Sequence, residues 1–378
     1  MQPTQREDRN AGLEVSLELA GKSWKLAASH AARANPAIVQ VNATGLWERL
    51  QQLLQQLNEF RRRWRLAADC PVVLIYEAGQ DGFWIARALQ AEGIEVFVVD
   101  AASIPVPRHA RRAKTDRLDA IKLLQVLRNW LRGERAEVRM VHIPSEAAEA
   151  QRLLTRERGL LQKEVEQHVD RIRKRLRLYG CVEKLDGQFV ERLTAGEVRQ
   201  TDGRPLPEEL WDWLMREWQR LELAREQLGR LEKTLLHQLP EPVQQTIALL
   251  ARLSGVGWVG ATRLVLELFW RDFANRRQLG ACVGLVPQPY DSGDSHTDQG
   301  ISKQGNARVR SLLIEMAWMW IRYQPDSELA QWFARRTAGP SKRGKRIAIV
   351  AVARRLAIAL WRYLRDGDIP AGARLKTA

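Results

Sequence analysis

An apolar strand, a helix and a second apolar strand follow one another between residues 71 and 99, and this order constrains the fold more than any other feature. Residues 71–76 and 94–99 are rich in Val, Ile and aromatic residues, and residues 82–89 between them have helical composition. Two strands joined through a helix pair in parallel with a right-handed crossover. We therefore predict an α/β domain whose parallel strands end at a binding crevice.

A β-hairpin is predicted to precede this unit. In residues 13–19, leucines and valine alternate with Glu14, Ser16 and Glu18, which is the period of a half-buried strand. Gly21 and Lys22 form the turn, and residues 23–27 return. Leucines at helical spacing then predict a helix over residues 45–65.

Two long charged segments predict an antiparallel coiled-coil arm. Apolar residues keep roughly heptad spacing over residues 147–178 and again over 210–239. A helical hairpin within one chain and a dimerisation arm both satisfy this pattern. We expect an α/β domain at 1–143, the arm at 144–242, and a mostly helical domain at 243–378.

The charge balance indicates a polyanionic partner. Lys and Arg number 60 against 45 Asp and Glu, a net charge of +15, which favours nucleic acid over a membrane. The longest apolar stretch, residues 347–361, is interrupted by Arg354 and Arg355 and is too short to span a bilayer. Three scattered cysteines and an N-terminus without an apolar segment predict a cytoplasmic protein.

Two glutamates are placed at predicted strands. Glu77 ends the apolar run 71–76, where a charge must be paired or exposed in a cleft. Glu18 lies on the polar face of the first strand. Carboxylates gathered at a sheet end supply the oxygen ligands that Mg²⁺ prefers beside a phosphate. We therefore expect Mg²⁺ as the cofactor.

Asp116 and Asp119 extend this acidic set. They are three residues apart, so on a helix their carboxylates share one face, and Thr115 precedes them as a cap. Taken by themselves, these two residues are better explained as a solvated acidic turn paired with Arg117. With Glu18 and Glu77 they would form a two-metal site able to activate an attacking oxygen and stabilise a leaving one.

Basic clusters and glycine-rich turns predict the nucleic-acid contacts. Residues 253–264 read as a helix-hairpin-helix turn, although an ordinary tight turn fits too, and residues 286–305 read as a long loop followed by a helix capped by Asn306. The stretch 339–346 superficially matches a P-loop, but Arg346 replaces the Mg²⁺-binding hydroxyl, which excludes nucleotide hydrolysis. The predicted contacts are Arg108, Arg111, Arg112, Lys114, Arg173, Arg177, Gly255, Gly257, Lys303, Asn306, Arg308, Arg310, Lys342 and Arg343.

The motifs of this chain, in their order, resemble those of the DEDD transposases of the insertion-sequence family IS110, more closely its IS1111 branch. These enzymes use an RNA guide encoded by the element, called bridge RNA or seekRNA. The resemblance covers nearly the whole chain. It rests on residues 76–78, 114–120, 254–257, 284–287, 291–293 and 300–306, of which 114–120 and 300–306 are the most specific.

The resemblance implies a RuvC-like, ribonuclease-H-like domain, a coiled-coil arm and a C-terminal transposase domain. It assigns metal binding to Glu18, Glu77, Asp116 and Asp119, and it makes Ser292 the nucleophile that forms a covalent 5′-phosphoserine link to DNA. Without the resemblance, Tyr290 and Ser295 are competing candidates for the nucleophile. The implied partners are guide RNA, donor and target DNA, and further copies of the chain in a tetramer, as a dimer of dimers.

One position departs from the family pattern. The first acid of the family is normally an aspartate in the first strand, and the matching residue here is Glu18, with Glu14 as the alternative. Two other functions remain open at this stage. One is a hydrolytic DNA junction nuclease in which Ser292 has no role, and the other is a non-catalytic nucleic-acid scaffold whose acids pair with nearby arginines.

Overall fold

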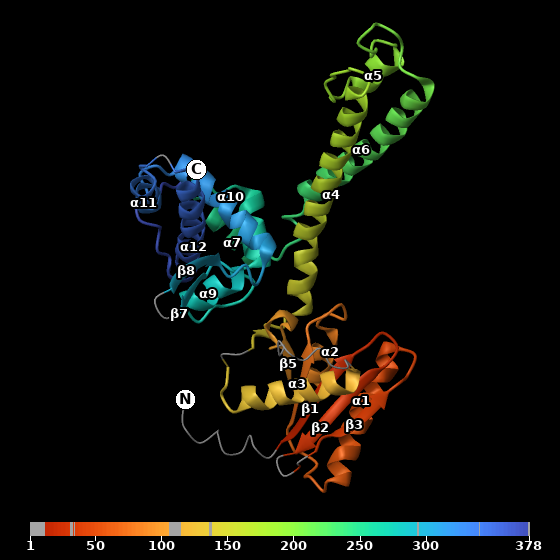
Figure 1. Ribbon diagram of the computed structural model, residues 1–378, viewed down its shortest axis with the longest axis vertical. Coiled ribbons are helices and arrows are strands. Elements are labelled where there is room, and N and C mark those ends of the chain that lie inside the picture. The colour runs from red at the N-terminus through yellow and green to blue at the C-terminus, as the bar shows by residue number, and fades with distance from the viewer. Residues whose placement is uncertain are drawn as a thin grey trace. The chain divides into compact units, whose positions relative to one another are not determined.

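A computed structural model of the chain describes residues 12–30, 33, 35–105, 115–135, 138–292, 295–339 and 341–376, with the side chains of 290–298 excepted. The chain forms two compact units, Met1–Ala147 and Ala148–Ala378. Figure 1 shows the elements of both units. No helix in the described ranges has the length and apolar composition needed to cross a bilayer.

The first unit is built on a six-stranded mixed sheet. Its strand order is β3-β2-β1-β4-β5-β6, with β1 parallel to β4 and β4 parallel to β5. The other neighbours are antiparallel. The strands are β1 (Leu13–Leu19), β2 (Trp24–His30), β3 (Ala37–Val41), β4 (Val72–Glu77), β5 (Glu95–Val99) and β6 (Met140–Val141). The predicted hairpin and parallel crossover are therefore confirmed.

Helices cover both faces of this sheet. The helices α1 (Leu46–Arg63) and α2 (Trp84–Ala91) bury leucines against the face formed by Leu13, Val15 and Leu17. The opposite face packs against α3 (Asp116–Leu131), drawn in yellow in Figure 1. A short 3₁₀ turn, Ala101–Ser103, follows β5. The alternation predicted for β1 thus separates an apolar core from a polar face under α3.

The arm of the second unit is a helical hairpin. It consists of α4 (Glu146–Arg177), the short α5 (Phe189–Thr194) and α6 (Glu208–Thr234). Arg158 pairs with Glu232, whereas His168 pairs with Glu217, so the two long helices run in opposite directions. A core that includes Ile172, Leu214 and Trp218 lies between them. The chain therefore forms the antiparallel helical pair by itself, and dimerisation through it stays a prediction.

A buried carboxylate holds the two arm helices in register. Glu217 is 2% exposed, and its oxygens lie 2.8 Å from His168 Nδ1, 3.0 Å from Arg171 Nη1 and 2.9 Å from Arg220 Nη1. Burial raises the pKa of Glu217, but these three hydrogen bonds more than offset that effect and leave the pKa below its ordinary value. The charged form of Glu217 is thus favoured by the folded arm.

Replacing this carboxylate should weaken the arm in a pH-dependent way. We expect Glu217→Gln to lower the free energy of unfolding by about 1–2 kcal/mol at neutral pH, because charged hydrogen bonds are lost while both arginines remain largely solvated. Since the folded pKa is depressed, the difference exists above the unfolded glutamate pKa of about 4.3 and disappears as the pH falls through the folded value.

Denaturant unfolding of both proteins between pH 3 and pH 7 measures this difference. Glu226→Gln is the matched control, because Glu226 is exposed on the same helix and pairs with Arg230 one turn away. Its effect should stay below about 0.5 kcal/mol. A Glu217→Gln difference that is constant over this pH range would contradict the assignment.

The rest of the second unit packs around one helical core. The helices are α7 (Glu241–Ala251), α8 (Trp258–Glu267), α9 (Arg276–Val283), α10 (Ala307–Tyr323), α11 (Glu328–Arg336) and α12 (Lys342–Asp366). Between α9 and α10 lie two antiparallel strands, β7 (Pro287–Ser292) and β8 (Ser295–Ile301). Trp320 is fully buried in the core, and its indole Nε1 donates to Ser327 Oγ at 3.0 Å.

Candidate active site

Glu18 and Glu77 lie at the carboxyl ends of neighbouring parallel strands, Glu77 as the last residue of β4 and Glu18 as the residue before the last of β1. Leu17 of β1 is in register with Tyr76 of β4, and the two glutamates are the next residues of their strands. Leu17 and Tyr76 are buried on the side of α1 and α2. Because side chains alternate along a strand, both glutamates face the other side, which α3 covers. Glu77 is exposed and Glu18 is half-buried.

The first turn of α3 carries the two aspartates to this same face. Thr115 caps the helix by accepting a hydrogen bond from Leu118 N at 3.3 Å, as predicted, and Asp116 and Asp119 occupy the first turn, where the helix dipole favours negative charge. Ser16 Oγ donates to the carbonyl oxygen of Ala120 at 2.5 Å and so fixes this turn against β1.

Lys25 connects the strand end to the helix. It is the β2 residue directly opposite Glu18, and its Nζ lies 3.9 Å from Asp116 Oδ2. The first turn of α3 therefore lies near the ends of β1 and β2. The fold thus brings Glu18, Glu77 and Asp116 to one face near the carboxyl ends of β1 and β4, and Asp119 belongs to the same first turn of α3 as Asp116.

These carboxylates do not form a closed metal cluster. Among the residues that the structure describes, no group of three or more His, Cys, Asp or Glu side chains is close enough to hold a metal ion. The donor set still fits Mg²⁺, because it consists of carboxylate oxygens around an accessible strand end, and Mg²⁺ in such sites takes only one or two carboxylates and completes its shell with water and substrate phosphate.

Glu14, the alternative first acid, has another partner. Arg128 in the last turn of α3 donates from Nε to Glu14 Oε2 at 2.7 Å and from Nη2 to Ser29 Oγ at 2.6 Å. Glu14 precedes Glu18 by four strand residues, a distance of about 13 Å. The geometry therefore places Glu14 in an ion pair away from the other acids, and Glu18 at their end of the sheet.

Ser292 lies at the tip of a β-hairpin. It is the last residue of β7 and pairs with Ser295, the first residue of β8. The expectation of one long loop over residues 286–305 was therefore wrong for residues 287–292 and 295–301, which form the two strands. Loop composition dominated that prediction, whereas the strands depend on pairing between residues such as Tyr290 and Thr297, which single-segment composition does not report.

Two glycines allow the base of this hairpin to close. Gly284 and Gly305 have φ of +66° and +86°, and a Cβ on either would clash with a backbone carbonyl oxygen, that of Gln304 or Cys282. Backbone hydrogen bonds then join the two sides, from Lys303 N to Gly284 O at 3.1 Å and from Asn306 N to Cys282 O at 2.9 Å. These motif glycines are therefore required for close backbone approach.

Asn306 connects the hairpin base to two helices. Its side-chain oxygen accepts from Arg308 N and Val309 N, which confirms the predicted cap of α10. Its amide nitrogen lies 3.4 Å from both the carbonyl oxygen and the carboxylate of Glu267 at the end of α8. Lys303 and Arg308 are exposed beside it, whereas Arg310 donates to the carbonyl oxygen of Val283 at 3.3 Å.

The predicted helix-hairpin-helix turn joins α7 to α8. Gly255 has φ of +83°, and a Cβ there would lie 3.2 Å from the carbonyl oxygen of Met319, so this glycine lets the turn pack on α10. Gly257 caps α8 without a side chain. A contact of this turn with phosphate stays a prediction.

The remaining predicted cations are distributed over the surface. Arg173 and Arg177 are exposed on α4, and Lys342 and Arg343 are exposed in the first turn of α12, which Ser341 caps. Arg108, Arg111, Arg112 and Lys114 lie outside the described residues.

Acids at one end of a sheet in a basic chain fit an enzyme that processes nucleic acid, and comparison with known proteins identifies the enzyme class. Residues 247–331 match the Transposase IS116/IS110/IS902 family, and residues 35–180 match the DEDD transposase family of IS110. A putative transposase, y4rJ, of Sinorhizobium fredii is 38% identical over 96% of this chain and 94% of its own length.

Two further relatives agree. The transposase for insertion sequence element IS1328 of Yersinia enterocolitica is 25% identical over 83% of this chain and 88% of its own length. The transposase for IS1111A of Coxiella burnetii is 33% identical over 30% of this chain and 31% of its own length. The chain belongs to the IS110 family of transposases. The matched ranges include Glu77, Asp116, Asp119 and Ser292, while Glu18 lies outside both.

Proposed function

We propose that this transposase is an RNA-guided DNA recombinase that excises and inserts an insertion sequence through a covalent phosphoserine intermediate. The observation that carries the proposal is the placement of Glu18, Glu77 and Asp116 near one sheet end, together with Ser292 at a hairpin tip inside the family-matched segment. The acids belong to a domain that we assign to the RuvC-like, ribonuclease-H-like class.

The chemistry divides between the two units. Ser292 Oγ attacks the scissile phosphorus and gives up its proton to water, the P–O bond to the serine forms as the bond to the 3′ oxygen breaks, and that oxygen takes up a proton from water and leaves as a 3′-hydroxyl. Glu18, Glu77, Asp116 and Asp119 would hold Mg²⁺, which when bound supplies positive charge for the attacking and leaving oxygens. A 3′-hydroxyl of another strand then displaces the serine. The covalent link keeps the phosphodiester energy, so rejoining needs no ATP.

The partners follow from the same proposal. Sequence choice is delegated to base pairing between a guide RNA and both donor and target DNA, as in other guided systems. The functional assembly is a dimer of dimers in which the acids of one subunit act with the serine of another, in the cytoplasm at the nucleoid. In this proposal, residues 1–143 are the catalytic domain, residues 144–242 are the arm, and residues 243–378 are the domain that carries the serine nucleophile.

Removing the metal tests this chemistry. In a mixture of protein, element-end DNA and RNA transcribed from the element's flanks, we expect a chelator to abolish covalent protein–DNA adducts and Mg²⁺ to restore them. DNA binding should persist without metal, because surface cations provide it. Denaturing gels measure the adduct and a mobility shift measures binding. Adducts that form equally well with chelator present contradict a metal-dependent step, and cleavage without adducts indicates hydrolysis.

Exchanging the RNA tests guidance separately. Changing the RNA segment that pairs with the target should redirect insertion to the matching DNA, as read by sequencing the junctions. Insertion that proceeds without RNA, or that ignores the change, contradicts the guided part of the proposal and leaves the strand chemistry standing.

A further inference from the structure

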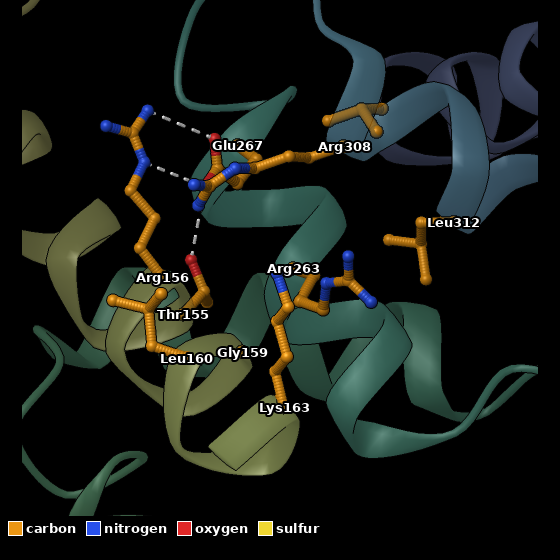
Figure 2. A pocket seen from close by; sticks show the side chains of 10 residues that line it. Thr155, Arg156, Gly159, Leu160, Lys163, Arg263, Glu267, Arg308 and Leu312 are labelled. Carbon is orange, nitrogen blue, oxygen red and sulfur yellow. Dashed lines mark hydrogen bonds and ion pairs between the residues drawn. The ribbon is translucent and has the colours of Figure 1, made fainter. Parts of the chain in front are cut away.

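A cavity lies in the second unit where the arm meets the helical core. It measures about 260 Å³ and is bounded by α4, α8 and α10 (Figure 2). Its lining combines basic side chains with the buried Val309 and Leu312 and with Leu160, which is exposed at its edge. The charged residues around it are Arg156, Lys163, Arg263, Glu267 and Arg308.

The acid of this cavity is already neutralised. Glu267 has a side chain only 5% exposed, and Arg156 approaches it with Nε at 3.2 Å from Oε1 and Nη2 at 3.5 Å from Oε2. Thr155 Oγ1 donates to Oε1 at 3.4 Å, and the Asn306 amide lies 3.4 Å from Oε2. A buried carboxylate is stable only when paired in this way, so its charge is not available to other cations.

Three cations remain around the cavity. Lys163 extends from α4, the Arg263 side chain extends from α8 toward Leu312, and Arg308 reaches across from α10 toward Glu267 (Figure 2). None of the three forms an ion pair within the described part of the chain. In contrast, Arg158, which is also on α4 but does not line this cavity, pairs with Glu232 at 2.6 Å. Like charges around one cavity repel one another, and a bound anion would remove this repulsion.

We infer that this cavity binds a backbone phosphate of a polynucleotide. The guanidinium groups of arginine can form paired hydrogen bonds to phosphate oxygens, and the apolar side chains of Leu160 and Leu312 can contact the adjoining sugar. The volume is below the roughly 300–1,000 Å³ of drug-sized ligand pockets, which favours a phosphate and its sugar over a base pair. The choice of a polynucleotide over a free anion depends on the proposed function.

The location gives this contact a structural consequence. Lys163 belongs to the arm, Arg263 to the helix that ends in Glu267, and Arg308 to the first turn of the helix capped by Asn306. A phosphate held by all three would therefore fasten the base of the arm to the helices that support the Ser292 hairpin. Binding of nucleic acid would stiffen the joint between arm and serine domain.

The salt dependence of binding tests the inference. For the full-length protein, we expect Arg263→Gln to weaken binding uniformly across sequences and to reduce the slope of log affinity against log salt by about 0.9 on duplex DNA or about 0.7 on a single strand. Fluorescence anisotropy with duplex DNA, single-stranded DNA and single-stranded RNA measures the slope and shows which polymer enters. Lys163→Gln should produce a change in the same direction.

The control and the folding check use the same chain. Arg230→Gln removes one positive charge from an exposed site on α6 that already pairs with Glu226, and we expect its slope to equal that of the wild type within about 0.2. Lys163 is exposed, so its variant keeps the assay valid even if Arg263→Gln unfolds the core. Thermal unfolding monitors both.

Two results overturn the inference. In one, the Lys163 and Arg263 variants show the wild-type slope on all three polymers. In the other, inorganic phosphate protects the wild type, but not Lys163→Gln, against unfolding while the polymer slopes stay equal, which indicates a free-anion site. Failure of the proposed function can be told apart from failure of this inference. In that case the wild-type protein forms no Mg²⁺-dependent adducts, whatever the salt dependence of polymer binding by the variants.

Discussion

Ser292→Ala should abolish covalent protein–DNA adducts and strand exchange while leaving nucleic-acid binding unchanged. Removing a serine nucleophile lowers the rate by a factor on the order of 10⁶ where its role has been measured, so activity should fall below detection. Substrate affinity depends on cations elsewhere on the chain, which the substitution leaves in place. The measurement is a denaturing gel of labelled element-end DNA, with a mobility shift on the same samples.

The hairpin itself provides the matched control. Ser295 is the cross-strand partner of Ser292 at the same tip, so Ser295→Ala alters the same turn without removing the proposed nucleophile. We expect Ser295→Ala to form adducts at a rate within about tenfold of the wild type, because a small local distortion near the site lowers the rate far less than loss of the attacking hydroxyl. If Ser295→Ala is inactive and Ser292→Ala is active, the assignment is reversed. If both cleave without an adduct, the enzyme hydrolyses DNA with water.

The α/β domain could be predicted because its signals are local. The alternation of Leu13, Val15 and Leu17 with Glu14, Ser16 and Glu18 specifies both faces of β1, and the structure places the core and α3 accordingly. The distinct fates of Glu14 and Glu18 could not be predicted in this way. They depend on which part of α3 lies over each residue, Arg128 in one case and Asp116 near the other.

The arm shows the same division. Heptad spacing predicts two helices, but the pairing of Glu217 with His168 depends on a register between positions 49 residues apart. The cavity beside Lys163 is even harder to predict from the sequence, because Glu267 and Arg156, which form an ion pair there, are 111 residues apart in the chain. In the sequence, each of these side chains is indistinguishable from an ordinary surface or helix residue. Only the packed structure shows that Glu267 is paired with Arg156, whereas Lys163, Arg263 and Arg308 form no ion pair in the described part of the chain.

Glu77→Gln and Asp116→Asn should each lower Mg²⁺-dependent adduct formation by at least about 100-fold, since even outer-shell partners of a metal site change activity by 10–100-fold when replaced. Both side chains are exposed, so the free energy of unfolding should hardly change. The measurement is the yield of covalent adduct as a function of Mg²⁺ concentration. Weaker metal binding should first shift the midpoint of this curve to a higher Mg²⁺ concentration and then lower the maximal adduct yield.

Glu14→Gln tests whether Glu14 is a metal ligand or an acid of the same strand that has only a structural role. It removes the partner of Arg128, whose side chain is largely buried between β1, β2 and α3, so it should destabilise the domain by about 1–3 kcal/mol. The Mg²⁺ midpoint of the folded fraction should not move. A shifted midpoint in Glu14→Gln together with an unshifted one in Glu18→Gln would transfer the first metal ligand to Glu14. Normal activity in the Glu77 and Asp116 variants would instead exclude both carboxylates from catalysis and leave Asp116 only its ion pair with Lys25.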